Sequence, residues 1–168
     1  MGKSMTWLYR HNLWANLRLL DRCAELSDGQ LDLVGPGTYG TVRDTLVHLF
    51  AAEQRYVEAL RLAPYAEPWR ESQGFPGFDY LRRSAQYTGE SLIEIAENVA
   101  HDEFRTGTYR GGEFAMPAAV FLVQSLHHAM EHRSHIVSIL SPQGVELPHL
   151  DGWSFEDEIR ATLAQEQK

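Results

Sequence analysis

The sequence predicts an all-α fold: a four-helix bundle with a short β-hairpin or extended segment before the last long helix, and a short C-terminal helix. In four long segments, apolar residues recur every three or four positions, which is the helical period. The chain has 168 residues, of which 43% are hydrophobic, and this is enough to bury one core. No repeat and no linker rich in Pro, Gly or Ser divides it, so we expect a single domain over residues 1–168.

The first helix is expected from about residue 5 to residue 26. Its apolar positions step by three and four along Leu13, Leu17, Leu20 and Ala24. Ser27-Asp28-Gly29 ends this pattern. The segment from there to Gly40 contains Gly35-Pro36-Gly37 and is predicted to be a connecting loop.

The second helix is expected to begin after Thr41, which suits an N-cap. Asp44 follows three residues later, where the acid of a capping box would lie. The apolar pattern continues to about Leu62, and Pro64 and Pro68 prevent the helix from continuing. A loop rich in Pro, Gly and aromatic residues follows.

The third helix is expected over residues 78–99. Gly89 costs it roughly 1 kcal/mol relative to Ala, but the apolar pattern continues through it. From residue 103 to residue 116, alternating Thr and Phe residues flank a pair of glycines, which favours a β-hairpin or an extended loop.

The fourth helix is expected from Pro117, which suits a first helical position, to about Leu140. A short last helix follows over residues 154–163. The connections between the four long helices, about 14 to 16 residues each, are longer than an up-and-down bundle needs. We therefore expect either a function or a crossover topology in them.

The fourth helix carries four of the eight histidines of the chain within residues 126–136. At the helical period, His128, His132 and His135 project within about a 60° arc on a face that should be buried. His127 points to a polar strip instead. Neutral imidazole is the commonest metal ligand, and it is costly to bury without a partner.

Two histidines on one helix need a third ligand from a facing helix, and His48 on the second helix is the candidate. Three neutral nitrogens leave coordination positions open, as in catalytic metal sites. An H-x-x-x-H pair alone is a weak signal, so these residues remain open to a second interpretation: core histidines hydrogen-bonded to backbone and carboxylates. The remaining histidines give no geometric reason to be ligands: His11, His101 and His149.

Three further residues are candidates for a pocket. His135 is open to three roles, as an additional metal ligand, as a donor that orients a ligand, or as a residue that lines the substrate cavity, and we favour the cavity. Arg133 falls on the apolar side of its helix, where it suits a buried ion pair or an oligomer interface, or alternatively an anchor for a substrate carboxylate. Glu53, or Asp44, is a candidate orienting acid or base, against the simpler interpretation of a solvated or capping residue.

Composition excludes several classes of function. The formal charge of −8 argues against a nucleic-acid surface and against docking on an anionic membrane. No apolar run is long enough for a transmembrane helix, and the first residues lack the pattern of a signal peptide. The single cysteine, Cys23, permits no internal disulfide and falls in an apolar helical pattern. We expect a cytoplasmic protein.

The order of these motifs resembles the DinB family, whose YfiT-like members are metal-dependent enzymes. The resemblance extends over essentially the whole chain, through residues 41–48, Glu53, His128-x-x-x-His132-Arg133, Gly144 and Asp151-Gly152-Trp153. It implies the family's own four-helix topology, often as a homodimer. It also implies a divalent ion, zinc or nickel, on three histidines that map onto His48, His128 and His132.

Relatives in this group include thiol-dependent transferases and isomerases that act with mycothiol or bacillithiol. The resemblance therefore implies a metal-dependent S-transferase or hydrolase, with a small electrophilic substrate and a low-molecular-weight thiol as co-substrate. The alternative is a non-catalytic metal-binding bundle, or a ligand-binding or dimerisation protein. Ser134 and His135 stand where Gly and Gln are common in the family, which leaves the three ligands intact and changes the cavity lining.

Overall fold

The computed structural model describes residues 2–100, 102–109 and 111–166. Four long helices form a bundle: α1 (Gly2–Ala24), α3 (Val42–Arg61), α4 (Phe78–Asn98) and α5 (Ala118–Leu140). An antiparallel hairpin precedes α5, and a last helix follows it: β1 (Phe104–Tyr109), β2 (Gly112–Pro117) and α6 (Gly152–Glu166). The fold class expected from the sequence is confirmed.

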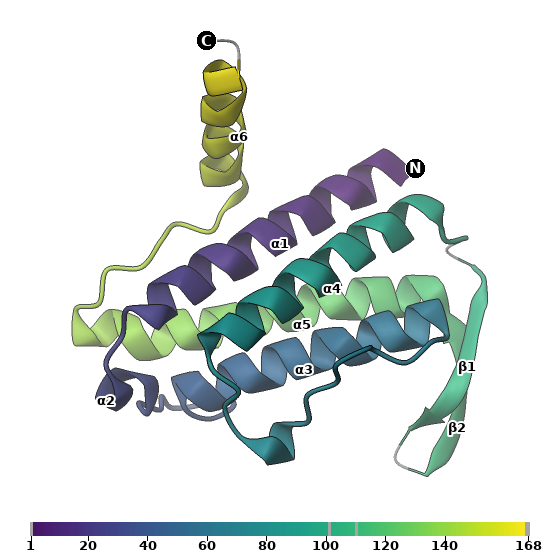
Figure 1. The fold of residues 1–168 in the computed structure, drawn as a ribbon, viewed down its shortest axis with the longest axis horizontal. Coiled ribbons are helices and arrows are strands. Elements are labelled where there is room, and N and C mark those ends of the chain that lie inside the picture. Colours follow the sequence, from purple (N-terminus) through teal and green to yellow (C-terminus); the bar gives the residue numbers. More distant parts are fainter. Residues whose placement is uncertain (1, 101, 110, 167–168) are drawn as a thin grey trace.

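The direction of the helices explains the long connection between α3 and α4. Helices α1 and α3 each pack against both α4 and α5. Figure 1 shows α3 and α4 running in the same direction, with α1 and α5 running the opposite way. The chain that leaves α3 must therefore return along the bundle before α4 can start. Residues 62–77 make this return, so the crossover topology accounts for their length.

Several boundaries differ from those expected. A short helix, α2 (Asp28–Leu31), lies in the predicted first loop because Ser27 and Gln30 form a capping box. Two single 3₁₀ turns, η1 (Glu71–Gln73) and η2 (Ser141–Gln143), also lie in connections. Pro117 ends β2 instead of opening a helix. The predicted cap of α3 is present, because the Thr41 side chain accepts from the backbone N–H of Asp44.

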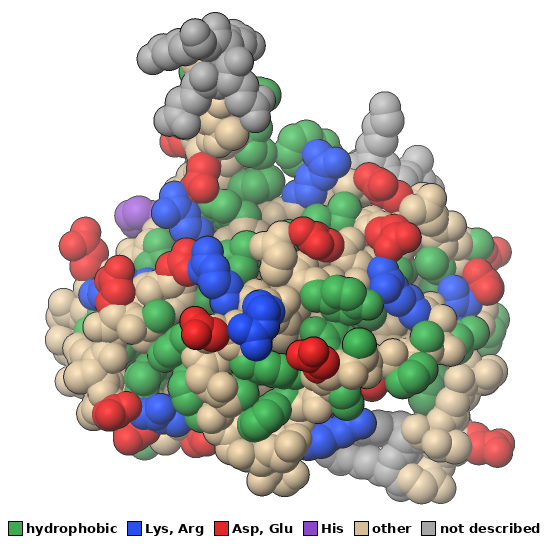
Figure 2. Space-filling view, in the orientation of Figure 1, with side chains coloured by type: hydrophobic (Ala, Val, Ile, Leu, Met, Phe, Trp, Pro, Cys, Tyr) green, Lys and Arg blue, Asp and Glu red, His purple; other side chains and the backbone are tan. Residues whose placement is uncertain are grey.

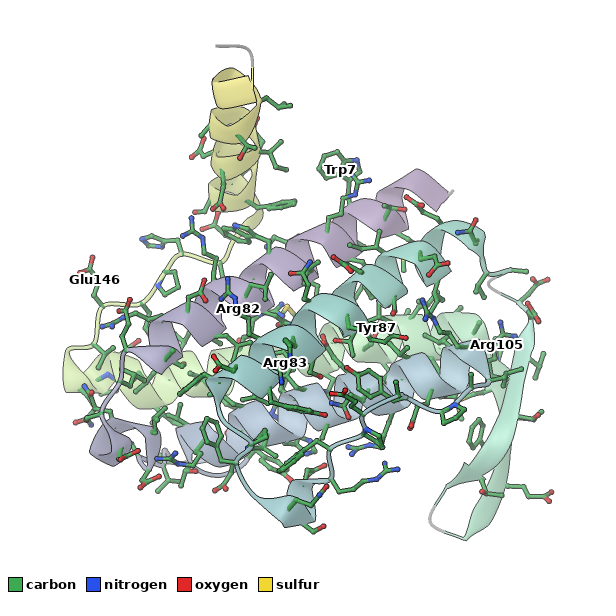
Figure 3. The ribbon with its side chains drawn as sticks, viewed as in Figure 1. Trp7, Arg82, Arg83, Tyr87, Arg105 and Glu146 are labelled. Carbon is green, nitrogen blue, oxygen red and sulfur yellow. The ribbon has the colours of Figure 1, made fainter. Side chains whose placement is uncertain are left out.

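The hairpin is fixed to the end of α3 by a buried arginine. The Nε atom of Arg105 on β1 donates to the backbone carbonyl of Leu60 at 2.9 Å, and Figure 3 shows Arg105 beside the end of that helix. The Arg105 side chain also forms an ion pair with Glu103. These bonds hold the strands next to α3 and α5.

Apolar side chains fill the bundle in two clusters with a polar layer between them. One cluster lies around Leu46, Phe50, Leu81 and Ile136, and the other around Tyr9, Leu60, Leu92 and Leu122. Because both clusters draw on all four long helices, they fix the helices against one another along the whole bundle.

Glu53 lies at the centre of the polar layer and is fully buried. Its carboxylate accepts from the Nδ2 atoms of Asn12 (3.1 Å) and Asn16 (2.8 Å), and from the Thr88 hydroxyl (2.8 Å). The two asparagines in turn accept from Nη1 of Arg133, both at 2.6 Å. Burial raises the pKa of the Glu53 carboxyl, and it lowers the pKa of Arg133 to about 10. The asparagines therefore bridge the buried Glu53 carboxyl group and the buried Arg133 guanidinium.

The surface is mixed in charge. Figure 2 shows Lys and Arg interspersed with Asp and Glu over the face it displays. Figure 1 shows α6 projecting from the bundle, where it meets α1 through a hydrogen bond from Trp14 to Glu158 at 2.8 Å. Within the described ranges, no helix has the length and apolar character needed to cross a membrane.

The polar layer predicts the effect of removing its cation. Arg133→Met should lower the free energy of unfolding by about 3–5 kcal/mol, because it leaves the Glu53 carboxylate buried without its counter-charge. Urea unfolding followed by circular dichroism measures this. The matched control is Arg83→Met on the exposed face of α4 (Figure 3), which should change stability by about 0.5 kcal/mol or less. If the Arg133→Met variant were as stable as the wild type, the proposed stabilisation of Glu53 by Arg133 through the two asparagines would be wrong.

Candidate metal centre

The three histidines expected to meet do lie together, because α3 packs against α5. His48 projects from α3, and His128 and His132 project from successive turns of α5. One ring nitrogen from each lies within 4.8 Å of the other two. The Nε2 atoms of His48 and His128 are 3.1 Å apart.

The hydrogen bonding of His48 determines which of its nitrogens is free. Its Nδ1 lies 2.9 Å from Oε2 of Glu71. A carboxylate only accepts, so Nδ1 carries the proton and Nε2 has a lone pair directed at His128. Two nitrogen ligands of one zinc ion are about 2.9–3.4 Å apart, since each Zn–N bond is about 2.0–2.1 Å. The separation of 3.1 Å between the two Nε2 atoms fits that geometry.

Burial favours the neutral form of the pair on α5. Desolvation, reinforced by the neighbouring imidazoles, lowers the pKa of His128 to about 3 and that of His132 to about 4. Neutral imidazole is the form that binds metals. No described residue forms a hydrogen bond with the buried Nδ1 atom of either histidine. Core histidines held by backbone and carboxylates would have such partners, so the donor set fits a divalent ion better than that interpretation does.

Glu71, on the connection between α3 and α4, orients His48 and was not expected from the sequence. It also accepts from the Tyr39 hydroxyl at 2.9 Å and from Nη2 of Arg55 at 3.1 Å. Burial raises the pKa of Glu71, but the hydrogen bonds from His48 and Tyr39 outweigh it, and the pKa is lowered overall. Glu71 is therefore held as a carboxylate. Second ring nitrogens of metal-bound histidines commonly donate to such a group.

Tyr39 covers one face of His48. The two rings are stacked, with centroids 3.9 Å apart and planes 18° apart. Tyr39 also contacts the edge of the His132 ring at 5.5 Å. This residue precedes α3, so the aromatic contact and the hydrogen bond to Glu71 tie two separate loops to the histidine cluster.

The acids expected near the cluster have other roles. Asp44 caps α3, and Glu53 lies in the polar layer of the core with Arg133. Neither Glu53 nor Arg133 is among the residues that line the cavity described below, so the structure does not place them in a pocket. Glu53 follows His48 by five positions, which turns the two side chains roughly 140° apart around α3. Among the described acids, Glu71 is the one that hydrogen-bonds to a histidine of the cluster.

The other histidines lie apart from the cluster or at its edge. The ring of His135 is 5.2 Å from that of His132, and it does not line the cavity either. His127 is exposed, as expected, and so is His149. His11 is 2.8 Å from the Leu150 carbonyl. His101 lies outside the described residues.

A cavity of about 800 Å³ opens beside the cluster, and His48 and His128 form part of its wall. It lies between α3, α5, the hairpin and residues 62–70. Other lining residues include Ala52, Arg55, Tyr56, Phe114, Met116 and Phe121. Ala52, Arg55 and Tyr56 follow His48 by four, seven and eight positions on α3. The helical period therefore predicts from the sequence that they lie on the same side of the helix as His48.

The model of the DinB family matches residues 1–166. The chain belongs to the DinB family. The fold is also similar to the crystal structure of a DinB-like protein from Bacillus cereus ATCC 10987, with a TM-score of 0.63 at 16% identity; the match covers 84% of this chain and 91% of that one. No curated protein matches the sequence. The family and the histidine cluster together fit a metal-binding DinB-like protein.

The geometry makes a direct prediction for the ligands. His48→Ala, His128→Ala and His132→Ala should each abolish stoichiometric binding of zinc or nickel, because two imidazoles hold a divalent ion much more weakly than three. Elemental analysis of protein purified without a histidine tag measures this. His127→Ala is the control and should keep its metal. Full retention in any of the three variants, or equal loss in the control, would refute the assignment.

A second prediction concerns Glu71. Glu71→Gln should lower zinc affinity about 10- to 100-fold, because the carboxylate fixes the tautomer and direction of His48. Competition with a chromogenic chelator gives the affinity. Glu67→Gln, an exposed acid on the same connection, is the matched control and should bind zinc as the wild type does. If the two variants bound zinc with equal affinity, Glu71 would have no role in metal binding.

Proposed function

We propose that this DinB-family protein is a metal-dependent enzyme that binds zinc or nickel through His48, His128 and His132. The observation that carries the proposal is that two of these residues, His48 and His128, also form the wall of the cavity. Three protein ligands leave coordination positions for an outside molecule, as in catalytic sites. The cavity of about 800 Å³ is large enough for a small substrate beside them.

The proposed reaction uses a thiol supplied from outside. His48, His128 and His132 would hold a divalent ion, which when bound would lower the pKa of a coordinated thiol or water and so supply a nucleophile at neutral pH. The only cysteine of the sequence, Cys23, is fully buried in the core, and burial raises its pKa to about 12. We therefore propose a low-molecular-weight thiol as co-substrate and S-transfer to a small electrophile. A closely related alternative is hydrolysis, in which water attacks the electrophilic substrate in place of the thiol.

The chain's own residues prepare the site for this chemistry. Glu71 keeps Nδ1 of His48 protonated, which leaves Nε2 available as a ligand. Tyr39 stacks on one face of the His48 ring, and the packing of α3 on α5 brings the three histidines together. Apolar side chains from α3, β2 and α5 line the cavity, where an electrophile would bind.

The test is thiol-dependent turnover. Protein loaded with zinc or nickel is incubated with 1-chloro-2,4-dinitrobenzene and a panel of low-molecular-weight thiols, and conjugation is followed by absorbance. We expect turnover that disappears in His128→Ala and in metal-free protein. The metal-free form should retain its helical circular dichroism, because the two apolar clusters support the bundle.

A different result would favour the rival function, a non-catalytic metal-binding bundle. In that case the metal would leave only on unfolding, and neither thiols nor hydrolysable substrates would be consumed. That outcome would contradict the enzymatic proposal while leaving the metal site in place.

A further inference from the structure

Two arginines lie in the wall of the cavity that adjoins the histidine cluster. Arg55 follows His48 by seven residues on α3, which places both on the same side of the helix, two turns apart. Arg70 comes from the connection that returns along the bundle. A guanidinium presents five donors and stays charged at any pH the protein meets.

Both arginines retain free donors. Arg55 uses Nη2 for its bond to Glu71 at 3.1 Å, and no hydrogen bond to a described residue uses its Nε or Nη1. The Arg70 side chain is exposed and forms no ion pair with any residue that the structure describes. The donors that remain are thus available to a molecule in the cavity.

The acids that line the cavity leave part of this positive charge uncancelled. Glu58 is the carboxylate among the lining residues, and its Oε1 accepts the backbone N–H of Tyr65 at 3.0 Å. Glu71 lies outside the lining and divides its hydrogen bonds among Arg55, His48 and Tyr39. Because Glu71 pairs with Arg55 at 3.1 Å, the positive charge of Arg70 is the one in the wall that has no acidic partner among the described residues. This charge matches a monoanion.

The rest of the cavity suits an apolar body. Phe114 and Met116 from β2, Phe121 from α5 and Tyr56 from α3 line it. The rings of Phe114 and Phe121 pack against each other, with centroids 5.6 Å apart. A site with a few placed polar groups in an apolar lining is typical of small-molecule pockets.

We propose that the cavity binds an organic carboxylate, whose anionic group pairs with Arg70 and Arg55 and whose apolar body lies against Phe114 and Phe121. This places the remainder of the molecule beside His48 and His128. This proposal rests on the proposed function, because it names the class of substrate that the enzyme would present to its metal centre. The sequence offered Arg133 for this role, but the guanidinium of Arg133 is committed to the core.

The test uses a matched pair of probes, 4-phenylbutyrate and its neutral amide. Isothermal titration of zinc-loaded protein should show that the carboxylate binds about tenfold or more tightly than the amide. Arg70→Gln should remove most of that preference, and Arg70→Gln with Arg55→Gln should abolish it. Arg83→Gln is the matched control on the exposed face of α4 and should keep the preference. A preference unchanged in the double variant overturns the proposal.

A second arm separates the arginines from the metal, since a carboxylate is also able to bind an ion directly. The titrations are repeated after removal of the metal with EDTA. We expect the preference for the carboxylate to persist, and its loss on metal removal overturns the proposal. Failure of the wild type to bind metal at all would contradict the proposed function alone, because this arm measures the arginine site without metal. Circular dichroism of each variant checks that it is folded.

Discussion

The contact between α3 and α5 is the interaction on which the rest of the site depends. It places Nε2 of His48 at 3.1 Å from Nε2 of His128, although the two residues are 80 positions apart in the chain. The contact is held by apolar clusters on both sides of the polar layer, so the histidines meet at a position that the core has already fixed. Preorganisation of this kind lowers the entropic cost of assembling a ligand set.

The features that the sequence predicted are those with a local or periodic cause. The long helices follow from apolar residues at helical spacing, and the cap of α3 follows from Thr41 and Asp44, three residues apart. The convergence of His128 and His132 follows from an i, i+4 spacing on one helix. The choice of His48 as their partner needed only the inference that its helix faces theirs.

The features that the sequence did not predict depend on contacts between segments that are distant along the chain. Glu71 lies in a connection without periodicity, so no pattern indicated that it would reach His48. The bridge from Arg133 through Asn12 and Asn16 to Glu53 joins three helices, and each of its members looks alone like a polar residue out of place. Arg55 had a visible signal, its i+7 spacing from His48, but a charged residue at such a position also suits a solvated face.

The return of residues 62–77 along the bundle divides the site between the helices and the segments that join them. The helices supply the three imidazoles, whereas this connection and the hairpin supply Arg70, Phe114 and Met116 to the cavity. Replacing the exposed Arg70 would change the cavity wall while Glu71 of the same connection still orients His48 and Arg105 of the hairpin still anchors the strands. The same scaffold can thus diverge toward new substrates through single lining residues of its loops, provided that the few residues that hold the site together are kept.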